Sequence, residues 1–171
     1  MQKHKGFSLI ELLIVVAIIL IIAAIAIPNL MRARIAANDS SAAASIRMIN
    51  TAEVAYFSTY PTIGYPLTLA PLGGPSPCTP GVATACVIDN SLATAVAGSS
   101  GKSGYYFNAT GSAAAGSPFN DQFYSTGTPL GIISGSRAYC SIEDGVVRLQ
   151  PAGNITLVAG YAACSALTPM N

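Results

Sequence analysis

The first sixty residues carry two successive hydrophobic patterns. Between Phe7 and Ile27 every residue except Ser8 and Glu11 is apolar. Beyond Ile27, apolar residues recur at intervals of three, four or seven, as on one stripe of an amphipathic helix: Met31, Ile35, Ala42, Ile46, Ile49 and Tyr56. The two patterns together predict one long helix over 7–60, apolar on all sides in its first half and amphipathic in its second.

This predicted helix contains a single breaker. No glycine occurs between Phe7 and Ile63, so Pro28 is the only residue that would interrupt the helix. Helical patterning resumes after it, and we therefore expect a kink at Pro28 rather than a helix end. Pro61 and Gly64 end the pattern.

The predicted helix is too long to be buried inside a globule made from the rest of the chain. Its apolar segment, 7–27, would be roughly 31 Å long as a helix, which matches the hydrocarbon core of a bilayer. We therefore expect this half to be buried in lipid or against neighbouring subunits.

The remainder, 61–171, is expected to form a globular head. Its first part, the loop 61–87, begins with dense Pro, Gly, Ser and Thr, which leaves no room for regular secondary structure up to Pro80. A short helix is compatible with 88–98, with Asp89 or Asn90 as its N-cap.

Four runs in the head are rich in β-forming residues: 104–109, 122–126, 137–142 and 146–150. The last two flank Glu143-Asp144-Gly145, and an Asp-Gly pair between such runs indicates a hairpin. An antiparallel sheet over about 104–150, packed on the amphipathic half of the long helix, makes the predicted fold class α+β.

Charge is scarce in this chain. Only 9% of the 171 residues are charged, against about 25% in an ordinary soluble domain. Lys3 and Lys5 precede the apolar segment, so we expect the N-terminus in the cytoplasm and the head outside. Without the first six residues, six basic and seven acidic side chains remain. No basic surface is left that would indicate nucleic acid as a partner.

A cleavable secretory signal is the main alternative for the N-terminus. The basic start and the Ala24-Ile25-Ala26 triplet fit such a signal loosely. The apolar run is longer than the 7–15 residues typical of signals, and Glu11 lies near its start. We therefore favour a retained membrane span over a signal that is removed.

The stretch KGFSLIELLIVVAIILIIAAIAIPNL resembles the N-terminal segment of type IV pilins and of the related pseudopilins of type II secretion. The shared features are a short basic leader, Gly, an aromatic residue, Ser-Leu-Ile-Glu, and an apolar run with Pro near its end. The resemblance is close over about 30 residues and looser as far as Tyr60. It implies that a prepilin peptidase removes the leader 1–6 by cutting after Gly6, and that Phe7 becomes N-methylated. Pro28 matches the family's helix-bending proline.

Glu11 is the costly residue in this segment, since a charge inside a membrane helix is unfavourable by about 2.5–3.5 kcal/mol at its centre. The resemblance implies a role in subunit assembly. Glu11 would face the Phe7 ammonium of a neighbouring subunit, because buried charges are normally paired. Methylation keeps that positive charge. The alternative is a carboxylate that reaches the interface or caps the helix start.

Four cysteines lie outside the predicted helix, and none belongs to a CxxC motif. They permit three connectivities, of which local closure favours Cys78–Cys86 and Cys140–Cys164. A bridge that encloses the C-terminal region is also what the resemblance to pilins implies. Four free thiols are the alternative, which an exported chain makes unfavourable.

The sequence carries no set of catalytic or metal-ligating residues that we recognise. His4 is the only histidine and lies in the leader. The stretch GSSGKSG at 98–104 lacks the spacing of a phosphate-binding loop, so we interpret it as a solvated loop. Glu143 and Asp144 are interpreted as a turn, with a calcium site, as in some pseudopilin heads, as the alternative. We expect no catalytic residue, no metal and no cofactor.

The sequence is therefore interpreted as a structural subunit of a type IV pilus-like filament. Its expected partners are identical subunits, the prepilin peptidase, the membrane before assembly and the inner-membrane assembly machinery. Three alternatives remain: a type II secretion pseudopilin, which forms a short periplasmic piston; a minor pilin that binds surfaces or DNA; and an enzyme tethered to the membrane. The absence of clustered carboxylates and of a histidine beyond the leader makes the last one unfavourable.

Overall fold

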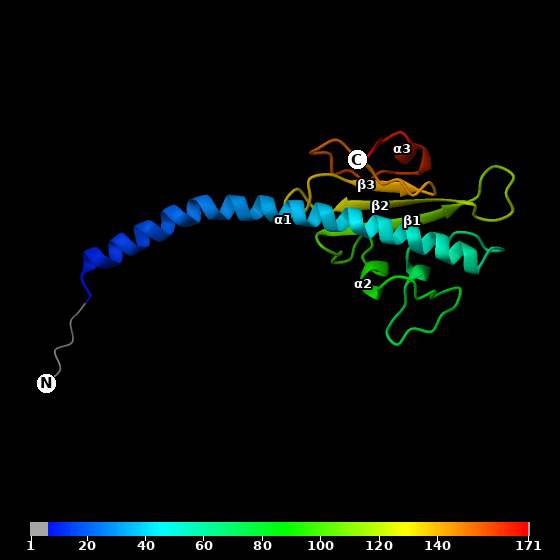
Figure 1. Ribbon diagram of the computed structural model, residues 1–171, viewed down its shortest axis with the longest axis horizontal. Coiled ribbons are helices and arrows are strands. Elements are labelled where there is room, and N and C mark those ends of the chain that lie inside the picture. Colours follow the sequence, from blue (N-terminus) through cyan, green and yellow to red (C-terminus); the bar gives the residue numbers. More distant parts are fainter. Residues whose placement is uncertain (1–6, 171) are drawn as a thin grey trace. The chain divides into compact units, whose positions relative to one another are not determined.

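A computed structural model describes residues 7–170 (Figure 1). Helix α1, Leu9–Thr59, contains 51 residues and includes Pro28. The chain divides into two compact units, which we call the N-terminal unit, ending at Arg34, and the C-terminal unit, starting at Ile35. The second half of α1 therefore belongs to the C-terminal unit, together with all the other helices and strands described here.

The C-terminal unit contains one antiparallel sheet whose five strands follow the order of the chain: β1, Tyr105–Ser112; β2, Gln122–Pro129; β3, Tyr139–Ile142; β4, Arg148–Leu149; and β5, Thr168–Pro169. The first four lie within or overlap the predicted runs, and residues 143–147, which include the predicted Asp-Gly turn, join β3 to β4. The predicted α+β fold class is confirmed. The pattern did not predict β5, because it is two residues long and includes a proline.

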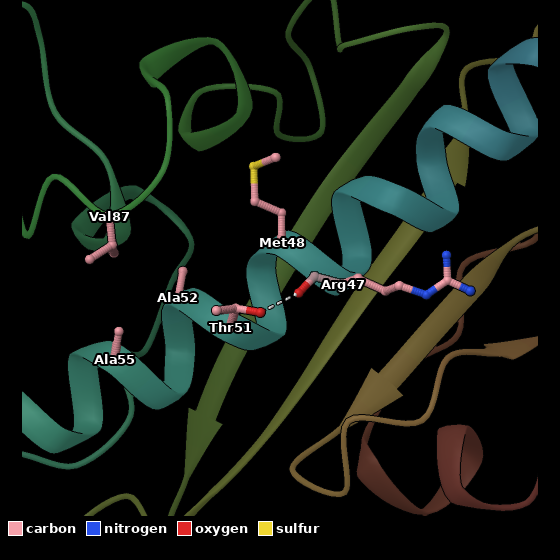
Figure 2. Close-up of a pocket in the computed structure, with 6 residues that line it drawn as sticks. All are labelled: Arg47, Met48, Thr51, Ala52, Ala55 and Val87. Carbon is pink, nitrogen blue, oxygen red and sulfur yellow. Dashed lines mark hydrogen bonds between the residues drawn. The ribbon is translucent and has the colours of Figure 1, made fainter.

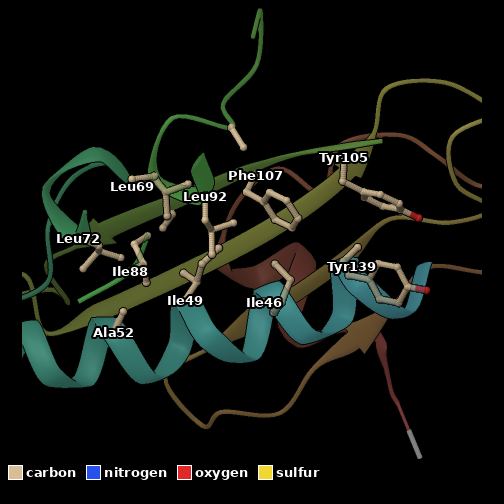
Figure 3. Close-up of a cluster of buried hydrophobic side chains, with 14 of the residues drawn as sticks. Ile46, Ile49, Ala52, Leu69, Leu72, Ile88, Leu92, Tyr105, Phe107 and Tyr139 are labelled. Atoms are coloured by element: carbon tan, nitrogen blue, oxygen red, sulfur yellow. The ribbon is translucent and has the colours of Figure 1, made fainter. Parts of the chain in front are cut away.

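The sheet packs on the amphipathic half of α1 (Figures 1 and 3). Ala42, Ile46, Ile49 and Tyr56 of the predicted stripe are all at most 2% exposed. The strand β1 contributes alternate side chains to the same core, as the period of a half-buried strand requires. The cluster that joins helix and sheet also includes Ala52, Leu69, Leu72, Ile88, Leu92, Tyr105, Phe107 and Tyr139.

Two short helices between α1 and β1 complete this core. The 3-10 helix η1, Ala70–Leu72, lies in a stretch that the sequence predicted to be irregular. It forms there because Leu69 and Leu72 have a hydrophobic core to enter, and both are at most 1% exposed. The helix α2, Asn90–Ala93, begins after the predicted N-cap Asp89, whose carboxylate accepts a 3.0 Å hydrogen bond from the Leu92 N–H.

The four cysteines form the two pairs that local closure favours. The Cys78–Cys86 bridge closes a loop between η1 and α2. The second bridge links Cys140 on β3 to Cys164 on α3, Tyr161–Ser165. Both of its cysteines are fully buried, so this bridge fixes the last helix of the chain to the sheet.

Two polar side chains of α1 connect it to the strands. The Asn50 amide donates to the Ser141 hydroxyl at 2.7 Å and accepts from the Ser125 hydroxyl at 3.0 Å. Eleven residues earlier on α1, the Asp39 carboxylate accepts from the Tyr105 hydroxyl at 2.6 Å and from the Ser136 N–H at 3.0 Å. Because buried polar groups are costly when unpaired, these bonds specify how α1 lies against the sheet.

Glu53 is a buried carboxyl group on the same face of α1. It is 0% exposed, and neither of its oxygens has a hydrogen-bond partner among the described residues. Burial disfavours the charged form and raises the pKa of Glu53 to about 8. Glu53 is therefore protonated at neutral pH in the folded chain, whereas in the unfolded chain it ionises near its ordinary value of 4.5.

The buried Glu53 makes stability depend on pH. Between pH about 4.5 and about 8 the folded state holds a proton that the unfolded state releases, so stability falls as pH rises, by up to about 1.4 kcal/mol per pH unit. Denaturant unfolding of the full chain in detergent, followed by tyrosine circular dichroism, measures this slope. Glu53→Gln should flatten it, and an unchanged slope in that variant would contradict the assignment.

The two disulfides should stabilise the C-terminal unit unequally. Their cysteines are separated by 24 and 8 residues, and a longer closed loop restricts the unfolded chain more strongly. We expect about 3.4 kcal/mol for Cys140–Cys164 and about 2.5 kcal/mol for Cys78–Cys86. Paired replacement of each bridge by serines, measured by denaturant unfolding, tests this order, and an equal or reversed loss would contradict it.

Candidate assembly surface

The apolar segment 7–27 is exposed along its length in the single chain. Its large apolar side chains are between 46% exposed, at Val16, and 82% exposed, at Phe7. Within the described residues, α1 is the one helix long and apolar enough to span a membrane, and its most apolar stretch is not buried in the protein. A helix that is apolar on all sides is normally buried in lipid or in other protein.

The free energy at stake in this segment is large. Removing a Val, Leu, Ile or Phe side chain from water contributes about 1.5–3 kcal/mol, so about ten of them contribute about 15–30 kcal/mol. That exceeds the 5–15 kcal/mol by which a whole domain is typically stable. The segment therefore requires a partner, whether lipid or other copies of the chain.

Glu11 lies in the first turn of α1, where the structure assigns it a local contact. The helix begins at Leu9, so Ser8 occupies the N-cap position and Glu11 the third helical position. The Ser8 N–H donates a 2.9 Å hydrogen bond to the Glu11 carboxylate. This is one half of a capping box, and a negative charge at this end is also favoured by the helix dipole. In the single chain Glu11 thus makes the contact that the helix-capping alternative expects, and its role in assembly stays a prediction.

The other residues expected at this site are placed as follows. Gly6 lies outside the described residues, so the cleavage site stays a prediction. Phe7 precedes the N-cap and is solvent-exposed. Pro28 lies within α1, which continues on both sides of it, and the kink stays a prediction. The four cysteines all lie in the C-terminal unit, away from the apolar segment in sequence.

A second apolar surface lies on the outer face of α1 in the C-terminal unit. Figure 2 shows this groove, which is lined by Arg47, Met48, Thr51, Ala52, Ala55 and Val87. Between Arg47 and Met48 at one end of the groove and Val87 at the other, its helical lining consists of the small side chains of Thr51, Ala52 and Ala55. The Thr51 hydroxyl donates to the Arg47 carbonyl at 3.1 Å. Small side chains with satisfied polar groups allow another helix to approach closely.

The carboxylates of the head are held in local contacts. Asp144 pairs with the Arg148 guanidinium, whose hydrogen bonds hold the pKa of that carboxyl below its usual range. Its neighbour Glu143 accepts a hydrogen bond from the Tyr161 hydroxyl. No group of three or more His, Cys, Asp or Glu among residues 7–170 could hold a metal ion. These contacts favour the interpretation of this stretch as a turn.

The stretch 98–104 is also explained by local contacts. The Lys102 ammonium forms an ion pair with Asp89 at 3.0 Å, and the two side chains are 29% and 45% exposed. The hydrogen bond from Ser91 is the main cause that lowers the pKa of Asp89, and the contact with Lys102 lowers it further. This ion pair connects the loop 98–104 to the N-cap residue of α2 at the protein surface, which agrees with the predicted solvated loop.

Sequence reasoning missed three polar residues on the buried face of α1. Asp39 precedes Ala42 of the apolar stripe by three positions, and Asn50 and Glu53 each follow one of its isoleucines by four. Their helical spacing from the apolar stripe was therefore the signal that could have placed them on the inner face. The partners of Asp39 and Asn50 could not be predicted, because Ser125, Ser136 and Ser141 come from distant parts of the chain.

Comparison with known proteins finds similarity over a limited part of the chain. Residues 1–27 match the family model described as the prokaryotic N-terminal methylation motif. The chain is 46% identical over 56 residues to the type IV major pilin protein PilA of Myxococcus xanthus, which is 33% of this chain and 26% of that protein. It is 65% identical over 40 residues to the type IV wide pilus major component PilA4 of Thermus thermophilus, 23% of this chain and 30% of that protein.

These similarities are confined to part of each protein. The matched region spans less than a third of the length of either relative. No solved structure matches the chain significantly. The similarity therefore covers at most a third of this chain, and the architecture of the C-terminal unit stands on the geometry described above.

Proposed function

We propose that this chain, whose N-terminal segment is that of the type IV pilin family, is the structural subunit of a type IV pilus-like filament. The pilin relatives indicate a structural subunit and not an enzyme. Both are named as major pilus components, which favours a pilus over the pseudopilus of type II secretion and over a minor, binding pilin.

The observation that carries this proposal is the division of α1 between two environments. Its second half is buried against the antiparallel sheet, whereas its first half exposes an apolar surface that is uninterrupted from Leu12 to Ile27. In the precursor this half spans the inner membrane, with the N-terminus in the cytoplasm and the head outside. In the filament it packs against the same segment of other subunits, so the large gain from apolar burial is kept when the subunit leaves the lipid.

Processing prepares the N-terminus for assembly. The prepilin peptidase cleaves after Gly6 and methylates the new terminal residue, Phe7, as the match to the methylation motif supports. Cleavage removes Lys3 and Lys5 and creates an ammonium beside the N-cap Ser8. The assembly machinery of the inner membrane then transfers the processed subunit to the base of the filament.

Glu11 acts at both stages in this proposal. In the membrane it accepts the Ser8 N–H, which satisfies part of its hydrogen-bonding capacity within its own chain. In the filament it pairs with the Phe7 ammonium of a neighbouring subunit, a stronger charge-assisted contact. An incoming copy out of register would leave both charges buried and unpaired, so this pair would select the axial position of each subunit.

The processing step predicts a modified N-terminus. Mass spectrometry of the protein isolated from its native cells should find N-methylphenylalanine, derived from Phe7, as the first residue. The matched control is a strain without prepilin peptidase activity, in which the leader should remain attached. A mature chain that begins at Met1, or after Ala26 as a secretory signal would give, would contradict the proposal.

Two substitutions of Glu11 separate helix capping from subunit pairing. Glutamine can still accept the Ser8 N–H but carries no charge, whereas alanine removes both. If pairing is the role, Glu11→Gln and Glu11→Ala should each lower the yield of sedimentable filaments by about tenfold or more, because an unpaired buried charge costs about 3–5 kcal/mol. Both variants should still fractionate with the membrane. If Glu11→Gln gives the same filament yield as the wild-type chain, the pairing role is wrong and Glu11 serves only as a helix cap.

A further inference from the structure

The two disulfides of the C-terminal unit differ in their access to solvent. Cys140 and Cys164 are both 0% exposed, whereas Cys78 and Cys86 are each partly exposed. The loop that the second pair closes, 79–85, contains no fully buried residue. A thiol must reach a sulfur atom to exchange with a disulfide, and exposed bridges are the labile ones. In the folded chain an external thiol therefore reaches the Cys78–Cys86 bridge and is kept from the other.

The two limbs that meet at this bridge are held to the protein differently. In the outgoing limb, 85–88, the Ala85 N–H donates to the Pro71 carbonyl at 2.7 Å, and the Val87 N–H donates to the Leu72 carbonyl at 2.8 Å. The incoming limb, 74–80, makes no backbone-to-backbone hydrogen bond with any residue between 7 and 170. The covalent bond between the cysteines is therefore what fixes the incoming limb to the anchored outgoing one.

The tip of the loop has one polar contact with α1. The Tyr56 hydroxyl donates to the Val82 carbonyl at 2.9 Å, and it is the only hydrogen bond from α1 to the loop 79–85 in the described part of the chain. Within the tip, Gly81 and Thr84 exchange backbone hydrogen bonds at 3.0 and 3.1 Å. One such bond has a modest net free energy. Without the bridge, the contact with Tyr56 is too weak to hold the loop in a single conformation.

Two local features favour the open form of the bridge. Cys86 has a φ of 60°, a backbone conformation that residues other than glycine adopt uncommonly, and an opened loop is free to leave it. The Cys86 Sγ lies 3.4 Å from the Thr84 carbonyl oxygen, so the thiol formed by reduction has a hydrogen-bond acceptor beside it. Stabilisation of the reduced form makes a disulfide easier to reduce.

We propose that Cys78–Cys86 is a reversible redox switch, which an external dithiol opens in the folded chain while Cys140–Cys164 stays closed. Opening releases the loop from α1 and uncovers the Tyr56 hydroxyl, whereas the buried bridge keeps α3 on the sheet. The switch belongs to the C-terminal unit alone, so it does not depend on whether the chain forms a filament.

The reaction is a thiol–disulfide exchange. One thiolate of the dithiol attacks a sulfur of the bridge, the bond between the two sulfurs breaks, and the other cysteine leaves as a thiolate that takes up a proton. The second thiolate of the dithiol then attacks the mixed disulfide. The dithiol is thereby oxidised to its own disulfide, and its two electrons reduce Cys78 and Cys86 to thiols.

Selective reduction is tested on the full oxidised chain in detergent, without denaturant, with dithiothreitol as the dithiol. Samples are blocked with iodoacetamide at intervals, and mass spectrometry follows alkylation of each cysteine. We expect Cys78 and Cys86 to be alkylated about tenfold faster or more than Cys140 and Cys164, because only the first bridge is accessible. Equal rates, or faster opening of the buried bridge, would overturn the proposal.

Low concentrations of urea show whether the bridge opens in the folded state. Reduction that requires global unfolding accelerates steeply with denaturant, whereas direct attack on an accessible bridge does not. The rate for Cys78–Cys86 should therefore stay nearly constant below the unfolding transition, and a rate that follows unfolding would contradict a switch. In guanidinium that unfolds the chain, the two bridges should be reduced at comparable rates, which is the control for their intrinsic reactivity.

Hydrogen exchange of the singly reduced chain tests the conformational change. We expect faster exchange at the Gly81 and Thr84 amides, unchanged exchange in β1, and recovery when oxidised glutathione closes the bridge again. The double variant Cys78→Ser, Cys86→Ser should show the same loop exchange with and without dithiothreitol. If loop exchange is unchanged on reduction, or if the faster exchange extends into β1, the bridge is a structural link and not a switch.

Discussion

The structure depends on one constraint, which is that α1 must bury apolar surface against two different partners. Its second half has a partner in the same chain, the antiparallel sheet, which covers Ala42, Ile46, Ile49 and Tyr56. Its first half has none among the described residues and requires lipid or other subunits. A chain organised in this way is stable in a membrane or in an assembly, and transfer between the two conserves the main driving force, removal of apolar surface from water.

Polar contacts determine the details that apolar burial leaves open. Asp39 and Asn50 join α1 to the strands by hydrogen bonds that only one placement of the helix satisfies. Glu53 has no such partner and avoids the cost of a buried charge by keeping its proton. In the apolar segment, Glu11 has both a local donor and, in the proposed filament, a neighbour's ammonium. The same chemical group is thus neutral in one half of the helix and a candidate for pairing in the other.

Much of the architecture was predictable, for physical reasons that can be identified. A helix of 51 residues shows its period many times over, and the β-rich runs and the Asp-Gly turn are local signals. The 3-10 helix η1, helix α3 and strand β5 were not predicted, because each has five residues or fewer and forms only against distant elements. Leu72, for example, is fully buried in a segment whose composition favours a loop.

The sequence by itself determined the long helix, its division into an apolar and an amphipathic half, the sheet, and the resemblance that draws attention to Gly6, Phe7 and Glu11. These are short-range properties of residue type and spacing. Tertiary structure decided which polar residues of α1 are satisfied, that Glu53 is buried alone, and that one disulfide is partly exposed while the other is fully buried. Such facts depend on residues that are far apart in the chain, and no local pattern specifies which of them meet when the chain folds.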